Sequence, residues 1–400
     1  MKFIKELLNI KLKENIDMDK QQIKKQFETI YKQKPAHLFS CGGRFEILGN
    51  HTDHNHGKCI AATCDLQIVA SVSKSDNDVV SFQSAGYPSS VVDLSELNNK
   101  QSEVGSSNAL IRGVASYLVT NGYKVGGFNA YGDSSIFPGA GVSSSAAFEL
   151  LIGRIFSYLY NDDKIPKLVL CKAGQYAENT FFGKASGLLD QIGVGYGNIV
   201  SIDFENINEP KIENIEFPFD DLKFVIINTG GSHADLSHLY SAIPNDMYSA
   251  AKKGGVNYLR ETTLEKLNKC KLSENEYLKA KHFYGENERV DEAIKAIKSK
   301  DLQSFLEMIN ESRISSTNNL KNMSVDDQYE GSPLEACDYF NKITNGQGAI
   351  KINGGGFAGS VIAAIPKELV NLVTDKMGLK YGFNNVKVLN IRNDGPVLEE

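Results

Sequence analysis

The segment Pro138-Gly139-Ala140-Gly141-Val142-Ser143-Ser144-Ser145-Ala146-Ala147 joins a tight glycine-rich turn to three consecutive hydroxyl residues. An amphipathic stretch follows, and it predicts a helix that begins near Ser143 and ends near Tyr160. Glycine lets several backbone N–H groups point at one anion, and the start of a helix adds the positive end of its dipole. The segment therefore predicts a phosphate-binding loop, in which a serine can also ligate Mg²⁺.

The loop differs from two other nucleotide-binding motifs, and it has a structural alternative. No lysine follows the second glycine as in a Walker loop, and the glycine spacing differs from that of a dinucleotide-binding fingerprint. A glycine turn with a serine cap at a helix start is the structural alternative. Three consecutive serines exceed what one cap needs, which favours the phosphate-binding function.

Two further segments lie near the two ends of the chain. Residues 43–57 have the sequence GRFEILGNHTDHNHG, and residues 351–360 have the sequence KINGGGFAGS. Together with the central loop, and in this order, they resemble the three motifs of the galactokinases, a family of GHMP kinases. The first resembles the sugar-binding signature of that family, the loop resembles its ATP loop, and the last resembles its glycine-rich C-terminal motif. Weaker similarity spans most of the chain.

The resemblance implies a two-domain α+β GHMP kinase fold. We expect an N-terminal domain similar to ribosomal protein S5 domain 2 over residues 1–205, with sugar and ATP sites, and a ferredoxin-like α+β domain over residues 206–400. The active site would lie between them. The polar stretch Glu205–Phe219, which holds two prolines, is the candidate boundary.

The implied reaction is the ATP-dependent phosphorylation of the anomeric C1 hydroxyl of galactose. By the resemblance, Asp190 in the segment GLLDQ lies against that hydroxyl, and Arg44 lies beside both Asp190 and the transferred phosphoryl group. An anomeric hydroxyl is acidic enough for a carboxylate of ordinary pKa to accept its proton, and a guanidinium stabilises phosphoryl charge. The sequence leaves open whether Asp190 accepts the proton or only orients the hydroxyl. A turn or N-cap aspartate and a surface arginine are the structural alternatives.

Two oxygen-bearing residues resemble the Mg²⁺ ligands of this superfamily. They are Ser145, the last hydroxyl of the loop, and Glu178, which precedes Asn179 in a predicted helix. Mg²⁺ takes oxygen ligands and retains water, so a serine and a carboxylate suit it. An exposed helical glutamate is the structural alternative for Glu178. ATP and Mg²⁺ are accordingly the expected substrate and metal.

The expected sugar-binding residues come from the first and the last motif and from two positions between them. The resemblance assigns sugar hydroxyls to His51 and Asp53, and it adds the residues Asn50, Gly187, Tyr240 and Gly355. Without the resemblance, His51, Asp53, His54 and His56 would also be compatible with a zinc site. His54 stands where the family usually has tyrosine, and His56 stands where the family varies, so we expect both to be structural or to line the rim.

Position 50 departs from the family. Galactokinases carry a glutamate there, which contacts the sugar's 6-hydroxyl, whereas this chain has Asn50. An asparagine keeps the hydrogen-bonding capacity but removes the negative charge. A kinase for a C6-altered sugar such as galacturonic acid is therefore an alternative function. A non-catalytic galactose and ATP sensor is a further alternative, although the serine-alanine part of the loop, which such sensors lack, is intact.

The composition of the chain limits its core size, its partners and its cellular location. The chain has 400 residues with 41% hydrophobic content, enough for a large core. Its formal net charge of −6 disfavours nucleic-acid or acidic-membrane partners. Six cysteines without a C-x-x-C pair suggest reduced thiols and a cytoplasmic protein, for which we favour a monomer. Residues 1–15 contain Glu6 and lysines without a long apolar run, so we expect neither a signal peptide nor a membrane helix. The chain has no tryptophan, and no adenine pocket can be assigned.

Periodicity predicts a mixed order of helices and strands. Helices are expected at residues 19–33, 107–120, 143–160 and 166–180, and they dominate residues 246–320. Strands are expected at residues 45–48, 66–74, 79–83, 127–131, 222–228 and 386–391, and a strand and helix pair at residues 349–377.

Overall fold

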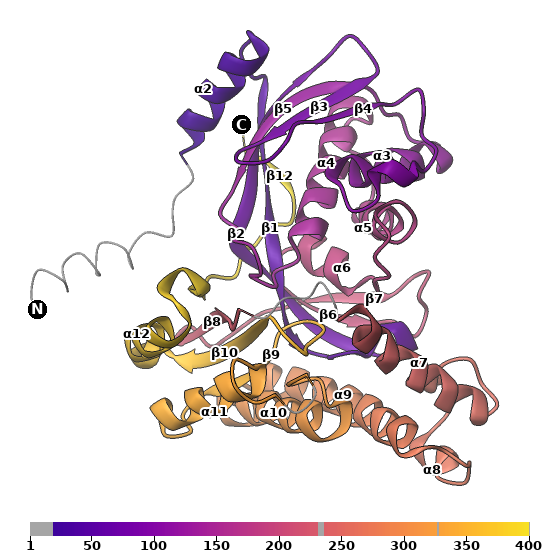
Figure 1. Ribbon diagram of the computed structural model, residues 1–400, viewed down its shortest axis with the longest axis vertical. Helices are drawn as coiled ribbons and strands as arrows, with labels where there is room; N and C mark the ends of the chain where they lie inside the picture. Colours follow the sequence, from indigo (N-terminus) through magenta and orange to yellow (C-terminus); the bar gives the residue numbers. More distant parts are fainter. Residues whose placement is uncertain (1–18, 231–235, 326–327, 400) are drawn as a thin grey trace, which may run out of the picture.

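Two β-sheets and their covering helices make up the computed structural model, which describes residues 19–230, 236–325 and 328–399 (Figure 1). The larger sheet has eight strands and the smaller has four. Residues 1–15, in which the sequence predicts no signal peptide, lie outside the described residues. Across these described ranges, every helix is too short or too polar to span a bilayer.

The larger sheet is built on two long antiparallel strands. β1 (His37–Leu48) pairs with β2 (Lys58–Lys74) along nearly its whole length, with register shifts between Gly42 and Arg44 and between Glu46 and Leu48. Such irregularities bend a strand and change the directions of its side chains. Arg44 and Glu46 lie beside these two irregularities of β1. The strands are ordered β12-β1-β2-β5-β3-β4, and β6 and β7 extend the sheet from the first half of β2. The other strands are β3 (Val79–Ser84), β4 (Ser90–Asp93), β5 (Phe128–Ser134), β6 (Ile199–Asp203), β7 (Lys211–Ile215) and β12 (Val397–Leu398).

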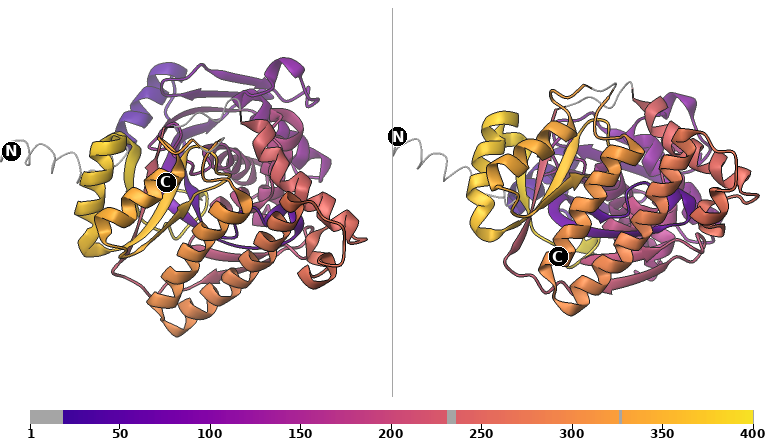
Figure 2. Two further views of the ribbon diagram at one scale, coloured as in Figure 1. Left: turned by 60° about the horizontal axis from the view of Figure 1, so that its bottom comes forward. Right: turned by 90° about the horizontal axis from the view of Figure 1, so that it is seen from below.

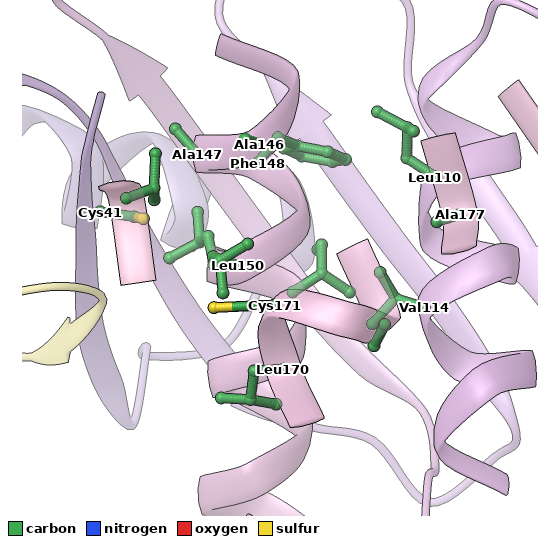
Figure 3. Close-up of a cluster of buried hydrophobic side chains, with 14 of the residues drawn as sticks. Cys41, Leu110, Val114, Ala146, Ala147, Phe148, Leu150, Leu170, Cys171 and Ala177 are labelled. Atoms are coloured by element: carbon green, nitrogen blue, oxygen red, sulfur yellow. The ribbon is translucent and has the colours of Figure 1, made fainter. Parts of the chain in front are cut away.

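One face of this sheet carries a layer of helices. Figure 3 shows Val114, Leu150 and Leu170, which come from three helices, in a single buried apolar cluster. Burial of such side chains stabilises the layer by about 1.5–3 kcal/mol for each fully buried residue. The helices are α3 (Ser107–Thr120), α4 (Ser144–Tyr160), α5 (Lys167–Tyr176) and α6 (Leu189–Gly195), and α5 continues into a π-helical turn, η3 (Ala177–Phe182). Helix α2 (Lys20–Tyr31) packs against β2 and β5.

The smaller sheet is antiparallel and has helices on both faces. Its order is β11-β8-β10-β9, and its strands are β8 (Leu222–Asn228), β9 (Ala349–Ile352), β10 (Ser360–Pro366) and β11 (Val386–Leu389). Ile226 and Ile362 share a core with Phe45 of β1 and with α9 (Glu274–Ser299) and α10 (Leu302–Ser315). Figure 2 shows α9 and α10, in orange, side by side. The opposite face packs against α11 (Pro333–Thr344) and α12 (Val370–Tyr381).

The predicted elements are found, with longer strands than expected. β1 and β2 each begin about eight residues before the predicted strands. The elements that were not expected are β4, β6, β7, β12, α6 and α11, and the predicted strand and helix pair at residues 349–377 contains two strands, β9 and β10. α7 (Ser237–Lys253) contains Pro244 and begins before the predicted helical region. The hairpin of β6 and β7 belongs to the larger sheet, and the chain enters the smaller sheet at Leu222. The division into residues 1–205 and 206–400 stays a prediction. The strand pairing places the change of sheet between Ile215 and Leu222.

Candidate active site

The glycine-rich loop turns sharply before α4. Gly139 and Gly141 have φ values of +75° and +70°, and Ser143 has a φ of +56°. A Cβ at Gly141 would lie 2.0 Å from the Ser360 hydroxyl, so the close contact with the C-terminal motif requires glycine. Ser143 occupies the N-cap position but makes no capping hydrogen bond with its side chain. The capping explanation is therefore wrong for Ser143, and the start of α4 keeps its N–H groups for another partner.

Arg44 and Asp190 meet beside this loop. The Arg44 Nε donates to Asp190 Oδ1 at 2.8 Å, and Nη2 lies 2.7 Å from the same oxygen. Arg44 Nη1 donates to the Gly141 carbonyl at 2.9 Å, and the Ser143 hydroxyl donates to Asp190 Oδ2. The first motif, the loop and the GLLDQ segment thus converge on one carboxylate. Arg44 is buried and so is not a surface arginine, and the N-cap of α6 is Leu188, so Asp190 is not an N-cap residue.

The surroundings of Asp190 keep it ionised. Burial alone would raise the pKa of Asp190, but the charges of Arg44 and Lys184 and the Ser143 hydroxyl hold it below its ordinary value. Asp190 also lies in the first turn of α6, where the helix dipole favours negative charge. A carboxylate in this state accepts hydrogen bonds and cannot donate one.

Ser145 and Glu178 also come together. The Ser145 hydroxyl donates to Glu178 Oε1 at 2.8 Å, and the Glu178 side chain is fully buried. Lys184 Nζ lies 2.7 Å from Oε1, while Ser186 and Gln191 donate to Oε2 at 2.7 and 3.1 Å. Glu178 is thus a buried, oriented carboxylate next to the N-terminus of α4, not an exposed helical residue. Two adjacent oxygen donors fit Mg²⁺, which completes its shell with water and phosphate oxygens.

The His51–Asp53 segment contacts the third motif and Gly187. The His51 Nε2 donates to the Gly355 carbonyl at 2.8 Å, so the first and third motifs touch. Asp53 approaches Gly187 so closely that a Cβ there would lie 1.7 Å from Asp53 Oδ2. Burial, followed by the charge of Asp190, raises the pKa of Asp53 to about 6. The structure brings together the four sugar-binding candidates His51, Asp53, Gly187 and Gly355.

The zinc alternative for the histidines finds no support. His56 stacks on Tyr258 with ring centroids 3.8 Å apart, and the His54 Nδ1 is paired with the Asn55 amide at 3.0 Å. Within residues 19–230, 236–325 and 328–399, no group of three or more His, Cys, Asp or Glu side chains is arranged to hold a metal ion. The histidines instead fix the loop between β1 and β2.

Asn50 is buried and held by protein groups. Its amide nitrogen donates to the Gly354 carbonyl at 2.7 Å and to Glu46 Oε1 at 3.1 Å, and its amide oxygen accepts from Asn322 at 3.0 Å. Glu46 forms a buried ion pair with Lys351, with Nζ 2.6 Å from Oε1. A direct contact between Asn50 and a sugar stays a prediction.

The third motif closes the site from the smaller sheet. Asn353 donates to the Gly141 carbonyl at 2.8 Å, and Ser360 donates to the Ala140 carbonyl at 3.0 Å. The Tyr240 hydroxyl donates to the Gly356 carbonyl at 2.8 Å, and its ring meets Phe357 edge-on. Tyr240 also lies against Gly355, where an added Cβ would be 2.5 Å from the tyrosine ring. Its contact with a ligand stays a prediction.

Three charged residues of the site were missed in the sequence. Glu46 follows Arg44 at a spacing of two on β1, which places both side chains on one face of a strand. Lys351 interrupts the apolar strand β9, and a lysine in a buried strand signals a specific partner. Lys184 lies between Glu178 and Asp190 in the sequence, and its charge acts on both.

Family models match two parts of the chain. The galactokinase galactose-binding signature matches residues 25–74, and the N-terminal domain of GHMP kinases matches residues 109–198. The galactokinase of Limosilactobacillus reuteri is 27% identical over 403 residues, which cover 95% of this chain and 99% of that protein. The galactokinase of Clostridium tetani is 28% identical over 382 residues, which cover 93% of this chain and 94% of that protein.

Solved structures share the fold. The galactokinase of Lactococcus lactis complexed with galactose has a TM-score of 0.83 at 23% identity, with 94% of this chain and 99% of that chain covered. The mevalonate kinase of Methanococcus jannaschii has a TM-score of 0.63 at 18% identity, with 90% and 98% covered. The expected α+β GHMP kinase fold is confirmed.

Proposed function

Because this chain belongs to the GHMP kinases and matches the galactose-binding signature of galactokinases, we propose that it phosphorylates the C1 hydroxyl of galactose with ATP. The products are galactose 1-phosphate and ADP. The observation that carries the proposal is the convergence of Arg44, Ser143 and the Gly141 carbonyl around Asp190. It joins a carboxylate for the hydroxyl, a cation for the phosphoryl group and the phosphate loop in one place.

In this reaction the C1 oxygen forms a bond to the γ-phosphorus of ATP, and the bond from that phosphorus to the β,γ-bridging oxygen breaks. Asp190 accepts the hydrogen bond of the C1 hydroxyl and takes up its proton as the new bond forms. Arg44 holds Asp190 and stabilises negative charge on the phosphoryl oxygens, since it stays protonated. The N–H groups of the loop and the start of α4 bind the phosphates.

Residues from both sheets hold the sugar in this proposal. His51 and Asp53 contact its hydroxyls, and Asn50, Tyr240, Gly187 and Gly355 complete the site. The half-buried Asp53 is fixed by the backbone N–H of His54 at 2.9 Å, so its orientation is preset. Preset acceptors discriminate strongly between hydroxyl configurations, because an unmatched polar group stays buried without a partner.

Ser145 and Glu178 would hold Mg²⁺, which neutralises phosphate charge when it is bound. Glu178 is suited to this because its side chain is buried and held by four hydrogen-bonding or charged neighbours. We further propose a cytoplasmic protein, since its cysteines are free thiols, and we favour a monomer.

A coupled assay of ADP release tests the proposal. It compares galactose with galactosamine, galacturonate, arabinose, glucose, mevalonate and homoserine, each with ATP and with GTP. We expect turnover with galactose and ATP, and loss of turnover in Asp190→Asn. Galacturonate as the far better substrate would replace galactose by a C6-altered sugar. Tight galactose and ATP binding without ADP release would instead indicate a sensor.

A further inference from the structure

The buried pair of Asn50 and Glu46 carries an inference that rests on the proposed function. Asn50 is 1% exposed and Glu46 is 2% exposed. The amide nitrogen of Asn50 is shared between Glu46 and Gly354, and its oxygen accepts from Asn322. The amide nitrogen and the amide oxygen of Asn50 both have protein partners. The orientation of the amide is therefore fixed by Glu46 on one side and Asn322 on the other.

Glu46 has acceptor capacity left. Its Oε1 receives Lys351 at 2.6 Å and the Asn50 amide at 3.1 Å, whereas Oε2 has a single longer contact with Asn50 at 3.4 Å. A carboxylate has about four lone-pair sites. The charge of Glu46 acts on Arg44, His51 and Asp53, so it lies within the electrostatic range of the catalytic and sugar-binding groups.

The charges around the sugar site do not favour an anionic ligand. The carboxylates are Glu46, Asp53 and Asp190. The cations that act on them, Arg44, Lys184 and Lys351, are each already paired with a carboxylate. An acidic sugar would need a free cation in a partly buried site, or it would meet uncompensated negative charge.

We propose that Glu46 is a specificity-determining residue of this site, which positions Asn50 and supplies the negative charge that excludes acidic sugars. The substrate class is then the neutral sugars. A single Asn50→Glu change does not strengthen this selectivity. It places a second buried carboxylate about 3 Å from the first, and the two must share the ammonium of Lys351.

An exchange of the two residues tests the proposal. The variants are Asn50→Glu, the exchange Glu46→Asn with Asn50→Glu, and the charge-free pair Glu46→Gln with Lys351→Met. The pair variant avoids an unpaired buried lysine, which would destabilise the fold by itself. For each protein, kcat/KM is measured for galactose and galacturonate, together with the KM for ATP. Calorimetry measures the binding of both sugars, and thermal unfolding monitors the fold.

We expect Asn50→Glu to lose about a hundredfold in kcat/KM for galactose and the exchange to recover at least about tenfold of that loss, because it restores a single carboxylate. The pair variant should lower the preference for galactose over galacturonate by about tenfold, with an unchanged KM for ATP. The proposal is overturned if Asn50→Glu is as active as the exchange, or if the pair variant keeps the preference of the unmutated enzyme. Galactose binding and turnover by the unmutated protein report separately on the proposed function.

Discussion

At the scale of single residues, Asp190 and Arg44 form the chemical centre of the site. Arg44 touches Asp190 through two nitrogens and the loop through a third. Asp190→Asn keeps the shape but loses the proton acceptor, and a lost general base typically lowers the rate by two to four orders of magnitude. We expect Asp190→Asn and Arg44→Ala each to abolish galactose turnover, measured as kcat by ADP release.

The matched control for both variants is ATP binding and the far-ultraviolet circular dichroism spectrum, which should stay close to those of the unmutated protein. Arg44→Lys separates charge from geometry, because lysine cannot make the two-nitrogen contact with Asp190. If Asp190→Asn keeps more than about a tenth of the unmutated kcat, Asp190 has no catalytic role.

Asp53 gives the site a pH dependence. Its pKa is raised to about 6 by burial and by the charge of Asp190. Below that pH the folded protein adds a proton to Asp53, and the carboxyl group can no longer accept from two hydroxyls. Asp190, whose pKa is lowered, stays ionised in the same range. We therefore expect kcat/KM for galactose to fall about tenfold per pH unit below pH 6.

The measurement is the initial rate of ADP release between pH 5 and 8 at limiting galactose. Asp53→Asn should bind galactose more weakly at every pH and should lack the change near pH 6. A kcat/KM that stays flat down to pH 5 in the unmutated enzyme would contradict the role of Asp53.

At the scale of elements, the phosphate loop and η3 act together. α4 brings Ser145 and the π-helical turn η3 brings Glu178, and the two side chains meet at 2.8 Å. π-helical turns often mark functional positions. Glu178→Gln keeps the hydrogen bonds of one oxygen but removes the charge, so we expect it to raise the Mg²⁺ concentration needed for half-maximal rate. Titration of activity with Mg²⁺ measures this, and equilibrium dialysis of Mg²⁺ gives an independent reading.

Ser186→Ala serves as the control, because Ser186 contacts the other oxygen of Glu178 and no loop residue. It should shift the Mg²⁺ requirement much less. Equal requirements for Glu178→Gln and the unmutated enzyme would show that Glu178 has a structural role only.

Some helices, strands and contacts could be predicted from the sequence, and others could not. The loop and the order of helices were predictable because glycine turns and helical periodicity are local signals. β1 was predicted too short, since His37–Gly43 has no alternation and is buried on both faces. Two partners of Asn50 could not be predicted, because Gly354 and Asn322 lie 304 and 272 positions away in the sequence. Such pairs depend on tertiary packing.

At the scale of the whole molecule, the site exists only where the two sheets meet. Asn353 and Ser360 bind the phosphate loop from the smaller sheet, and the glycines of the third motif bind His51 and Tyr240. Helix α9, which packs on the smaller sheet, adds a further contact between the parts of the site. His282 donates from Nε2 to the Asn50 carbonyl at 2.8 Å, and its Nδ1 is paired with Ser315 at 2.9 Å.

His282 should make the folded protein sensitive to acid. Burial, partly opposed by Glu286, lowers the pKa of His282 from 6.5 to about 4. Between these values the unfolded chain binds a proton that the folded protein does not, so stability falls as the pH drops from 6.5 to 4. At about 1.4 kcal/mol per pKa unit, the loss approaches about 3 kcal/mol. Glu286, with a pKa lowered to about 2, stays ionised throughout this window.

The midpoint of thermal unfolding across this pH range should therefore drop less in His282→Gln than in the unmutated protein. His56→Gln should reduce the dependence less than His282→Gln does, because burial also lowers the pKa of His56 but this imidazole, stacked on Tyr258, is only half-buried. If the midpoint of thermal unfolding falls equally with pH in His282→Gln and in the unmutated protein, His282 does not cause the acid sensitivity of the fold.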